Sequence, residues 1–405
     1  MIASPARRPV KTILYVTEIF PAMTSGASAA TLGMLRTLQR GGWDVDLVLN
    51  LRRADFARLD AIRPLCRTIV PVLRPRMRVT PVLEWARSLR RLGYVPRWQP
   101  QVWQEVDAAL STRPIDLVFL DHIRAAEYGR LCKERGHRIP VAIREHNVEH
   151  ELNARLAPEM PGRWERFETR LRAHRYRAVE QNLARYCDLV LPISHVDGAK
   201  LAALNPGLPL DAIPSPVDTA HYQPAPGRPS GKEIVFVGGM GYGPNRDAVT
   251  WFVQEILPAV VARHPDARFT AVGEKPPAWF AEHRGHVSGV GFVPDERPYV
   301  TRGRVFVAPI RYGSGVRTKI LNTLAMGRPV VATSVGAEGL LLEHGRAIVV
   351  ADSAREFADA VSAVLDDDAW AAALAESGLR ACLESYAPER VAERLRAAFA
   401  TVAPR

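Results

Sequence analysis

The sequence predicts an α/β protein built from two doubly wound parallel sheets. Twelve short apolar runs recur along the chain, each followed by a turn and a stretch with helical periodicity. The 405 residues are enough for two domains. An unperiodic Pro/Gly-rich segment, residues 211–231, separates the first six runs from the last six. We therefore expect an N-terminal Rossmann-like domain at 1–210, a linker at 211–231 and a C-terminal Rossmann-like domain at 232–385.

The apolar runs are short and rich in branched and aromatic residues, which is typical of strands buried on both faces of a parallel sheet. In the first domain the predicted strands are Thr12–Val16, Val45–Leu49, Thr68–Val72, Leu117–Leu120, Val141–Arg144 and Leu189–Ile193. In the second they are Ile234–Val237, Arg268–Val272, Val287–Phe292, Val305–Ile310, Val330–Thr333 and Ala347–Val350. Residues 386–405 form an amphipathic helix, which we expect to pack back on the N-terminal domain through Val391, Leu395, Ala398 and Phe399.

The composition is that of a soluble globular protein, with 47% hydrophobic and 24% charged residues. No apolar run approaches the ~20 residues that cross a bilayer. The four cysteines are scattered without the spacing of a metal site, which indicates reduced thiols. These features predict a cytoplasmic protein without bound metal.

The net charge of +11 lies mostly in the first half of the chain. Residues 51–100 alone hold twelve arginines against three acidic residues, with apolar residues and tryptophans between them. This pattern predicts a contact with the anionic headgroups of a membrane or with an anionic substrate. A nucleic-acid surface is the weaker alternative. A third interpretation is that arginine simply fills solvated faces, since the chain has 48 arginines and only six lysines.

A glycine-rich loop follows the predicted strand Val305–Ile310 and leads into a helix that ends at Gly327. Arg317 and Lys319 fall in the first turn of that helix, where unpaired cations cost a few tenths of a kcal/mol each against the helix dipole. An anion bound at this turn would reverse that cost. The loop Gly313-Ser314-Gly315 can offer its backbone N–H groups to the same anion. The segment therefore predicts a phosphate site.

The second domain opens on a strand that runs into Gly239 and Gly241, which resembles the start of a dinucleotide-binding fold. Pro244 stands where the third glycine of that motif belongs, and the acidic residue Glu274 comes about 35 residues on rather than about 20. We therefore disfavour NAD and predict an interface loop, in which Asn245 caps the following helix.

In the first domain, His146 follows the buried strand Val141–Arg144. Ligands of open α/β sheets bind at the carboxyl ends of the strands. His146 could therefore orient or polarise a substrate hydroxyl, and a histidine hydrogen-bonded within its loop is the alternative. Gly26, in the loop after the first strand, would let a substrate or the facing domain approach the backbone closely.

The motifs together resemble the GT-B glycosyltransferases of family 4, in their bacterial glycine-loop subgroup, over nearly the whole chain. The second domain carries the resemblance in GGMGYGPNRDA at 238–248, VGFVPD at 290–295, GSGVRTKIL at 313–321 and GAEGL at 336–340. The first domain carries it in REHNVE at 144–149 and IPSPVD at 213–218.

This resemblance implies a GT-B fold, with two Rossmann-like domains facing a cleft. It implies a retaining glycosyltransferase, which moves a sugar from a nucleoside-diphosphate sugar to a cell-envelope polysaccharide or lipid-linked acceptor. No cofactor or metal is expected. The enzyme would act in the cytoplasm or as a peripheral protein on the inner face of the bacterial plasma membrane.

The resemblance also assigns roles to residues. The donor diphosphate would lie over Gly313, Ser314 and Gly315, with Arg317 and Lys319 neutralising the leaving group. His146 aligns with the polar residue near the transferred sugar. Gly239, Tyr242, Arg246 and Glu274 form a candidate donor or interface loop, and Gly26 lies on the acceptor side.

Two residues depart from the family pattern. Ser314 and Asn322 stand where the family carries a pair of glutamates, the second of which holds the ribose hydroxyls. An Asn322 amide can still bind a ribose diol, but without charge assistance. The alternative function is therefore a catalytically weakened nucleotide-sugar-binding or partner subunit.

Overall fold

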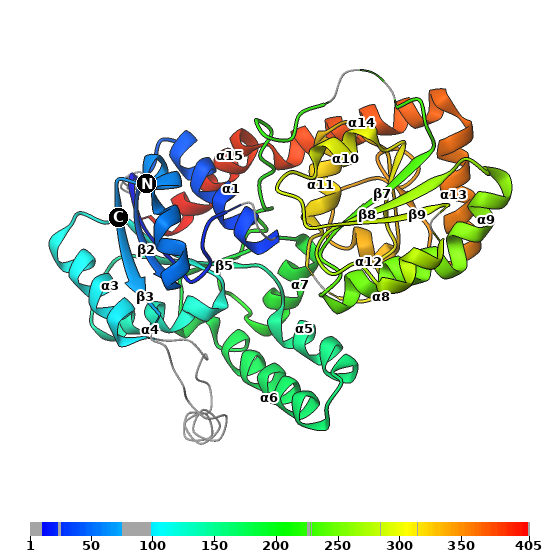
Figure 1. Cartoon of the computed structure of the whole chain (residues 1–405). Coiled ribbons are helices and arrows are strands. Elements are labelled where there is room, and N and C mark those ends of the chain that lie inside the picture. Colours follow the sequence, from blue (N-terminus) through cyan, green and yellow to red (C-terminus); the bar gives the residue numbers. More distant parts are fainter. Residues whose placement is uncertain are drawn as a thin grey trace. The chain divides into compact units, whose positions relative to one another are not determined.

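The computed structural model describes residues 10–22, 26–74, 99–224, 227, 229–283, 285–313 and 315–403. The chain forms two compact units (Figure 1). The first contains Met1–Pro216 and Pro388–Arg405, and the second contains Val217–Ala387. The last helix of the chain thus belongs to the same unit as the first strand.

The first unit is a six-stranded sheet in the order β3-β2-β1-β4-β5-β6, with every neighbouring pair parallel. Its strands are β1 Thr12–Thr17, β2 Asp44–Leu51, β3 Thr68–Leu73, β4 Leu117–Asp121, β5 Val141–Glu145 and β6 Leu189–Pro192. Its helices are α1 Gly26–Arg40, α3 Pro100–Thr112, α4 Ala126–Glu134, α5 Glu149–Leu156, α6 Arg163–Glu180, α7 His195–Leu204 and α15 Pro388–Val402.

Alternate residues of the central strand β1 feed two apolar cores, one on each face of this sheet. Leu14 and Val16 contribute to the core that includes side chains of α3 and α4. Ile13 and Tyr15 contribute to the opposite core, where α1 packs beside α15. The predicted apolar face of the C-terminal helix is buried in this second core, through Val391, Leu395, Ala398 and Phe399.

The second unit repeats the plan with the strand order β12-β11-β10-β7-β8-β9, again all parallel. Its strands are β7 Glu233–Val237, β8 Arg268–Val272, β9 Val287–Gly291, β10 Val305–Ala308, β11 Val330–Ala332 and β12 Val349–Val350. Its helices are α8 Gly243–Trp251, α9 Leu257–Arg263, α10 Arg297–Arg302, α11 Thr318–Ala325, α12 Ser334–Ala337, α13 Ala354–Asp366 and α14 Asp368–Tyr386.

The central strand β7 of this unit also alternates between two cores. Ile234 and Phe236 face the core shared with α8, α9 and α13. Val235 faces the core shared with α10 and α11. All twelve predicted strands are therefore confirmed, and both sheets are parallel and covered on both faces, as predicted. Of the arginine-rich stretch 51–100, residues 75–98 lie outside the described part of the chain.

Candidate functional site

The glycine loop and the start of the second unit meet because their strands are neighbours. Strand β7 pairs with β10 in parallel, so the segments that follow both strands emerge at the same edge of the sheet. There the Lys319 Nζ lies 2.8 Å from Oδ1 of Asn245. The same ammonium lies 4.4 Å from the centre of the Phe236 ring, over its face. One cation thus joins the two segments that the sequence singled out.

Asn245 does not cap α8, contrary to our expectation. The helix begins at Gly243, so Asn245 already lies in its first turn. Its side chain turns back instead, with Nδ2 donating to the Gly239 carbonyl over 3.0 Å and Oδ1 accepting from Lys319. Because the amide has both a donor and an acceptor, it can hold the loop and the lysine at once. The sequence around Asn245 did not indicate that its side chain would bind Lys319, which lies on the helix after β10.

The environment of Lys319 is unusual for an ammonium group. The side chain is half-buried, and burial together with the nearby Arg317 charge lowers the pKa of Lys319 to about 7. Arg317 is the residue that precedes α11, and Lys319 is the second residue of that helix. Lys319 therefore lies in the first turn, whereas Arg317, which we predicted in that turn, is the residue just before it; both lie near the positive end of the helix dipole. A bound anion would favour the charged form of the lysine.

The glycine loop folds around the Arg317 side chain. Gly313 has a φ of +126°, and a Cβ placed on it would lie 2.8 Å from Nη2 of Arg317. The Nη1 of the same guanidinium donates to the Gly315 carbonyl over 2.9 Å. A side chain at Gly313 would thus displace the arginine, which explains a glycine there. Ser314 lies outside the described residues.

A second close approach brings β7 and β8 together at this edge. A Cβ on Gly273 would lie 2.3 Å from the Gly238 carbonyl oxygen, and Gly273 has a φ of +147°. Only glycine allows this backbone contact. Sequence reasoning missed Gly273 because its partner comes from another strand.

The remaining predicted donor residues surround this edge more loosely. Asn322 lies one turn beyond Lys319 and is half-buried, and within the described chain its amide forms no hydrogen bond. Tyr242 is 48% exposed. Arg246 is exposed and donates from Nε to the Met240 carbonyl, while Glu274 is exposed and accepts from the Met240 N–H through its carbonyl.

In the first unit, His146 joins a buried polar cluster at the carboxyl ends of β4 and β5. Its Nε2 lies 2.7 Å from Oδ1 of Asp121, which also accepts from Nη1 of Arg144 over 3.2 Å. Thr31 donates to the other carboxylate oxygen of Asp121 over 2.7 Å. Gly26 is the exposed first residue of α1, on whose later turn Thr31 lies. The structure thus gives His146 three polar neighbours that the sequence did not indicate.

The charges of this cluster are set by burial and hydrogen bonding. Burial opposes the charge of Asp121, but bonds from His146, Arg144 and Thr31 hold the pKa of the carboxyl well below its usual value. Burial lowers the pKa of His146 despite the carboxylate beside it. Burial thus favours the neutral ring, and a neutral ring that donates Nε2–H to Asp121 has Nδ1 as an acceptor.

A second histidine, His122, lies beside the first. Their ring centroids are 5.4 Å apart. His122 has a φ of +88°, which is rare for a residue with a side chain. Its Nδ1 accepts from the Arg124 N–H over 3.2 Å, and its Nε2 lies 3.2 Å from Oε1 of Glu149. Nothing in the sequence indicated His122, because its positive φ is a property of the folded backbone.

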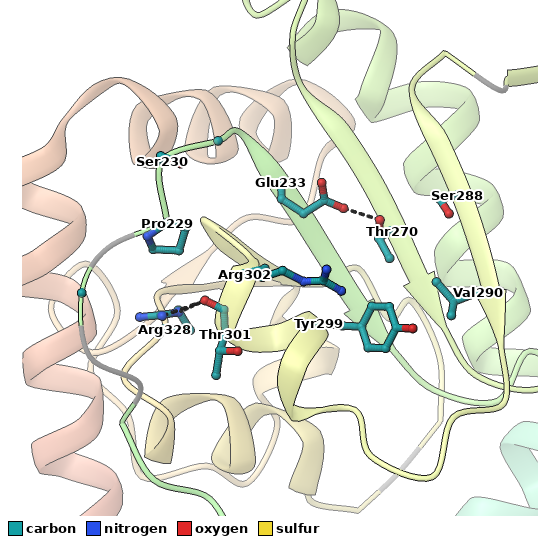
Figure 2. Close-up of a pocket in the computed structure, with 12 residues that line it drawn as sticks. Pro229, Ser230, Glu233, Thr270, Ser288, Val290, Tyr299, Thr301, Arg302 and Arg328 are labelled. Carbon is teal, nitrogen blue, oxygen red and sulfur yellow. Dashed lines mark hydrogen bonds between the residues drawn. The ribbon is translucent and has the colours of Figure 1, made fainter.

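One cavity of the second unit lies away from these residues. It encloses about 700 Å³ and is lined by residues that include Glu233, Thr270, Ser288, Arg302 and Arg328 (Figure 2). Figure 2 shows Glu233 bonded to Thr270 and Arg328 bonded to Thr301. Glu233 begins β7, whereas the glycine loop follows the carboxyl end of β10. None of the predicted site residues lines this cavity.

No group of three or more His, Cys, Asp or Glu side chains could hold a metal ion among the described residues. No described helix is both long enough and apolar enough to span a bilayer.

The second unit matches a known family by sequence. A family model described as "Glycosyl transferases group 1" matches residues 231–367. The lipopolysaccharide core biosynthesis mannosyltransferase LpsB of Rhizobium meliloti (strain 1021) is 35% identical over 99 residues, covering 24% of this chain and 28% of that protein. An uncharacterized 44.6 kDa protein in the cps region of Klebsiella pneumoniae is 26% identical over 135 residues, covering 31% and 35%. The matches span about a third of the length of these relatives.

Solved structures resemble the chain over nearly its whole length. The sucrose-phosphate synthase of Thermosynechococcus elongatus superposes with a TM-score of 0.70 at 18% identity, covering 95% of this chain and 97% of that one. Anabaena HepE, crystallised with UDP, superposes with a TM-score of 0.65 at 16% identity, covering 95% and 98%. These likenesses confirm the predicted fold class, the two-domain α/β architecture of GT-B glycosyltransferases. Membership of family 4 and of its glycine-loop subgroup stays a prediction.

Proposed function

We propose that this protein is a retaining glycosyltransferase, which transfers a sugar from a nucleoside-diphosphate sugar to a cell-envelope polysaccharide or lipid-linked acceptor. One observation carries the proposal. Lys319 and Arg317 lie together at the N-terminal end of α11, beside the glycine loop and the segment after β7. Two cations at a helix N-terminus oppose the helix dipole, whereas a diphosphate would be bound by both.

The comparisons support the chemical class of the donor. The family match at 231–367 includes the glycine loop, α11 and the segment after β7. HepE, which shares the fold, was crystallised with UDP and with UDP-glucose. LpsB, which matches part of the chain, is named a mannosyltransferase of lipopolysaccharide core biosynthesis. We therefore propose a nucleotide sugar as the donor and an envelope glycan or its lipid-linked precursor as the acceptor.

In the proposed reaction the bond between the sugar and the diphosphate breaks, and the oxygen of an acceptor hydroxyl bonds to the anomeric carbon. Negative charge grows on the leaving phosphate, which takes up the proton of that hydroxyl. Arg317, Lys319 and the backbone N–H groups of 313–315 would stabilise that charge. Asn322 would bind the ribose. His146, held by Asp121 and with its neutral form favoured by burial, would offer Nδ1 to a hydroxyl of the sugar. No metal is required by this scheme, because the cations belong to the protein.

The other predicted site residues have less specific roles in this proposal. Gly239, Tyr242, Arg246 and Glu274 would border the donor or the facing unit, and Gly26 would lie on the acceptor side. The arginine-rich stretch 51–100 would contact anionic lipid if the acceptor is lipid-linked. The proposed location is accordingly the cytoplasm or the inner face of the plasma membrane.

A second candidate function is a nucleotide-sugar-binding or partner subunit with weakened catalysis. It rests on Asn322, whose half-buried amide replaces a carboxylate at the proposed ribose site. A neutral amide forms weaker hydrogen bonds to a diol than an ionised carboxylate does. Nucleotide would therefore bind, but with less energy available for the reaction.

A two-part experiment separates these functions. Calorimetric titration with UDP, GDP, ADP and dTDP identifies the nucleotide. A radiolabelled nucleotide-sugar pool, offered with several glycan and lipid acceptors, then reports transfer and donor hydrolysis. Binding with turnover supports the transferase. Binding with neither transfer nor hydrolysis supports the partner subunit, and an absence of binding by all four nucleotides contradicts both.

A further inference from the structure

Helix α6 of the first unit turns one face towards its own domain and another towards solvent. It packs against α5, and these two helices lie side by side in Figure 1. Thr169, Tyr176 and Val179 are the buried residues that face the domain, together with Glu180. Trp164 and Phe167 lie on the outer side and are 53% and 48% exposed. Their ring centroids are 5.6 Å apart, so they form one aromatic surface.

Three arginines flank these rings. Arg163, Arg170 and Arg177 are spaced seven residues apart, which places them in one row along the helix. All three are exposed, and within the described part of the chain no ion pair involves them. The outer face therefore combines a pair of exposed aromatic rings with a row of cations.

The acidic residues of the helix do not neutralise this row. Glu165 accepts from the Gly162 N–H over 2.9 Å and so caps the helix. Glu180 is fully buried and accepts from the Glu149 N–H over 2.6 Å. Glu168 is the third glutamate, against six arginines in the whole helix. Two of the three negative charges are thus engaged in the fold, which leaves the outer face positive.

We propose that this face of α6 docks on an anionic membrane surface. Trp164 and Phe167 would insert at the boundary between headgroups and acyl chains, and the arginine row would lie against lipid phosphates. The charge is complementary to anionic lipid, and the aromatic rings supply the apolar contact that a phosphate alone would not need. This inference concerns a surface of the first unit and does not depend on the proposed transferase activity.

Vesicle co-sedimentation tests the proposal on the full chain. Wild type should bind vesicles of equal parts phosphatidylglycerol and phosphatidylcholine, bind pure phosphatidylcholine far less, and lose binding as salt rises. Arg163→Gln, Arg170→Gln and Arg177→Gln in one chain should lower partitioning on the order of a hundredfold. Trp164→Ser with Phe167→Ser should lower it at least about tenfold. Because these side chains are exposed, the melting temperature should stay at the wild-type value.

Matched controls make the test specific to α6. Phe292→Ser removes an aromatic side chain that is 64% exposed in the second unit, and Arg355→Gln removes an arginine whose side chain is 93% exposed there. Both controls should bind vesicles as wild type does. Wild-type binding by the α6 variants would overturn the proposal. The proposal would also be overturned if vesicle binding is lost only in a chain with Arg87→Gln, Arg90→Gln and Arg91→Gln. Membrane docking would then belong to the stretch 51–100.

Two further outcomes would assign the face to another partner. Sedimentation velocity without lipid shows whether the wild type self-associates. If the α6 substitutions dissociate an oligomer and leave vesicle binding intact, a second copy covers the face and the proposal fails. It also fails if these substitutions abolish binding to a DNA or RNA duplex while vesicle binding is unchanged.

Discussion

The low pKa of Lys319 makes nucleoside-diphosphate binding a proton-linked event. In the free protein this pKa is about 7, so about half of the lysines are charged at pH 7 and about a tenth at pH 8. A diphosphate beside the ammonium stabilises the charged form and raises the pKa. Binding should therefore take up about 0.9 proton at pH 8 and about 0.5 at pH 7.

The same linkage predicts the pH dependence of the affinity. The charged lysine is the binding form, and its fraction falls as the pH rises through 7. The dissociation constant for UDP should therefore rise about fivefold from pH 7 to 8 and about ninefold more from pH 8 to 9. The affinity is lost towards high pH, because a lysine with a depressed pKa is neutral there.

Calorimetry of UDP in two buffers with different ionisation enthalpies measures the protons directly. Lys319→Arg is the matched control, because its guanidinium stays charged through pH 9. That variant should bind UDP without proton uptake and with little pH dependence above pH 7. A wild type that binds UDP without taking up protons at pH 8, and with a flat affinity from pH 7 to 9, would refute the contact between Lys319 and the diphosphate.

Four other substitutions test the remaining parts of the site. Arg317→Ala should weaken UDP binding about 10- to 100-fold and uridine binding less than about twofold, because a charge-assisted bond to phosphate is lost; equal losses in titrations of both ligands would contradict the phosphate role. Asn322→Glu should tighten UDP about fivefold through a charged ribose contact, and an unchanged or weaker affinity would count against it. Gly273→Ala should destabilise the protein by about 2 kcal/mol or more in urea unfolding, because a Cβ would meet the Gly238 carbonyl; a wild-type midpoint would show that the contact relaxes freely. Asp121→Asn should lower the free energy of unfolding by about 3–5 kcal/mol, because the buried Arg144 loses its counter-charge. A variant that unfolds at the wild-type melting temperature would contradict the importance of that ion pair.

The fold was predictable because its signals are local. Each strand is a short apolar run, and each alternates between two cores once it lies in a sheet, as β1 and β7 do. The helix α11 was predictable from its periodicity, and its two cations from their place after the glycine loop. These features need only neighbouring residues in the chain, and the sequence contains them in full.

The site was predictable only in part, because its decisive contacts join distant residues. Asn245 has the local pattern of a helix cap, yet its amide binds Lys319, which lies 74 residues further on. Gly273 is an ordinary loop glycine until β8 pairs with β7 and brings the Gly238 carbonyl against it. His122 gives no sequence signal, since its positive φ follows from how β4 ends.

The sequence by itself determined the two parallel sheets, the glycine loop and the presence of two cations where a helix begins, because these follow from residue order and periodicity. The tertiary structure decided how those cations behave. Burial and the neighbouring Arg317 charge lower the pKa of Lys319. Packing on α5 likewise decided which residues of α6 stay exposed. Burial and electric field are sums over neighbours in space, and the order of residues along the chain does not contain them.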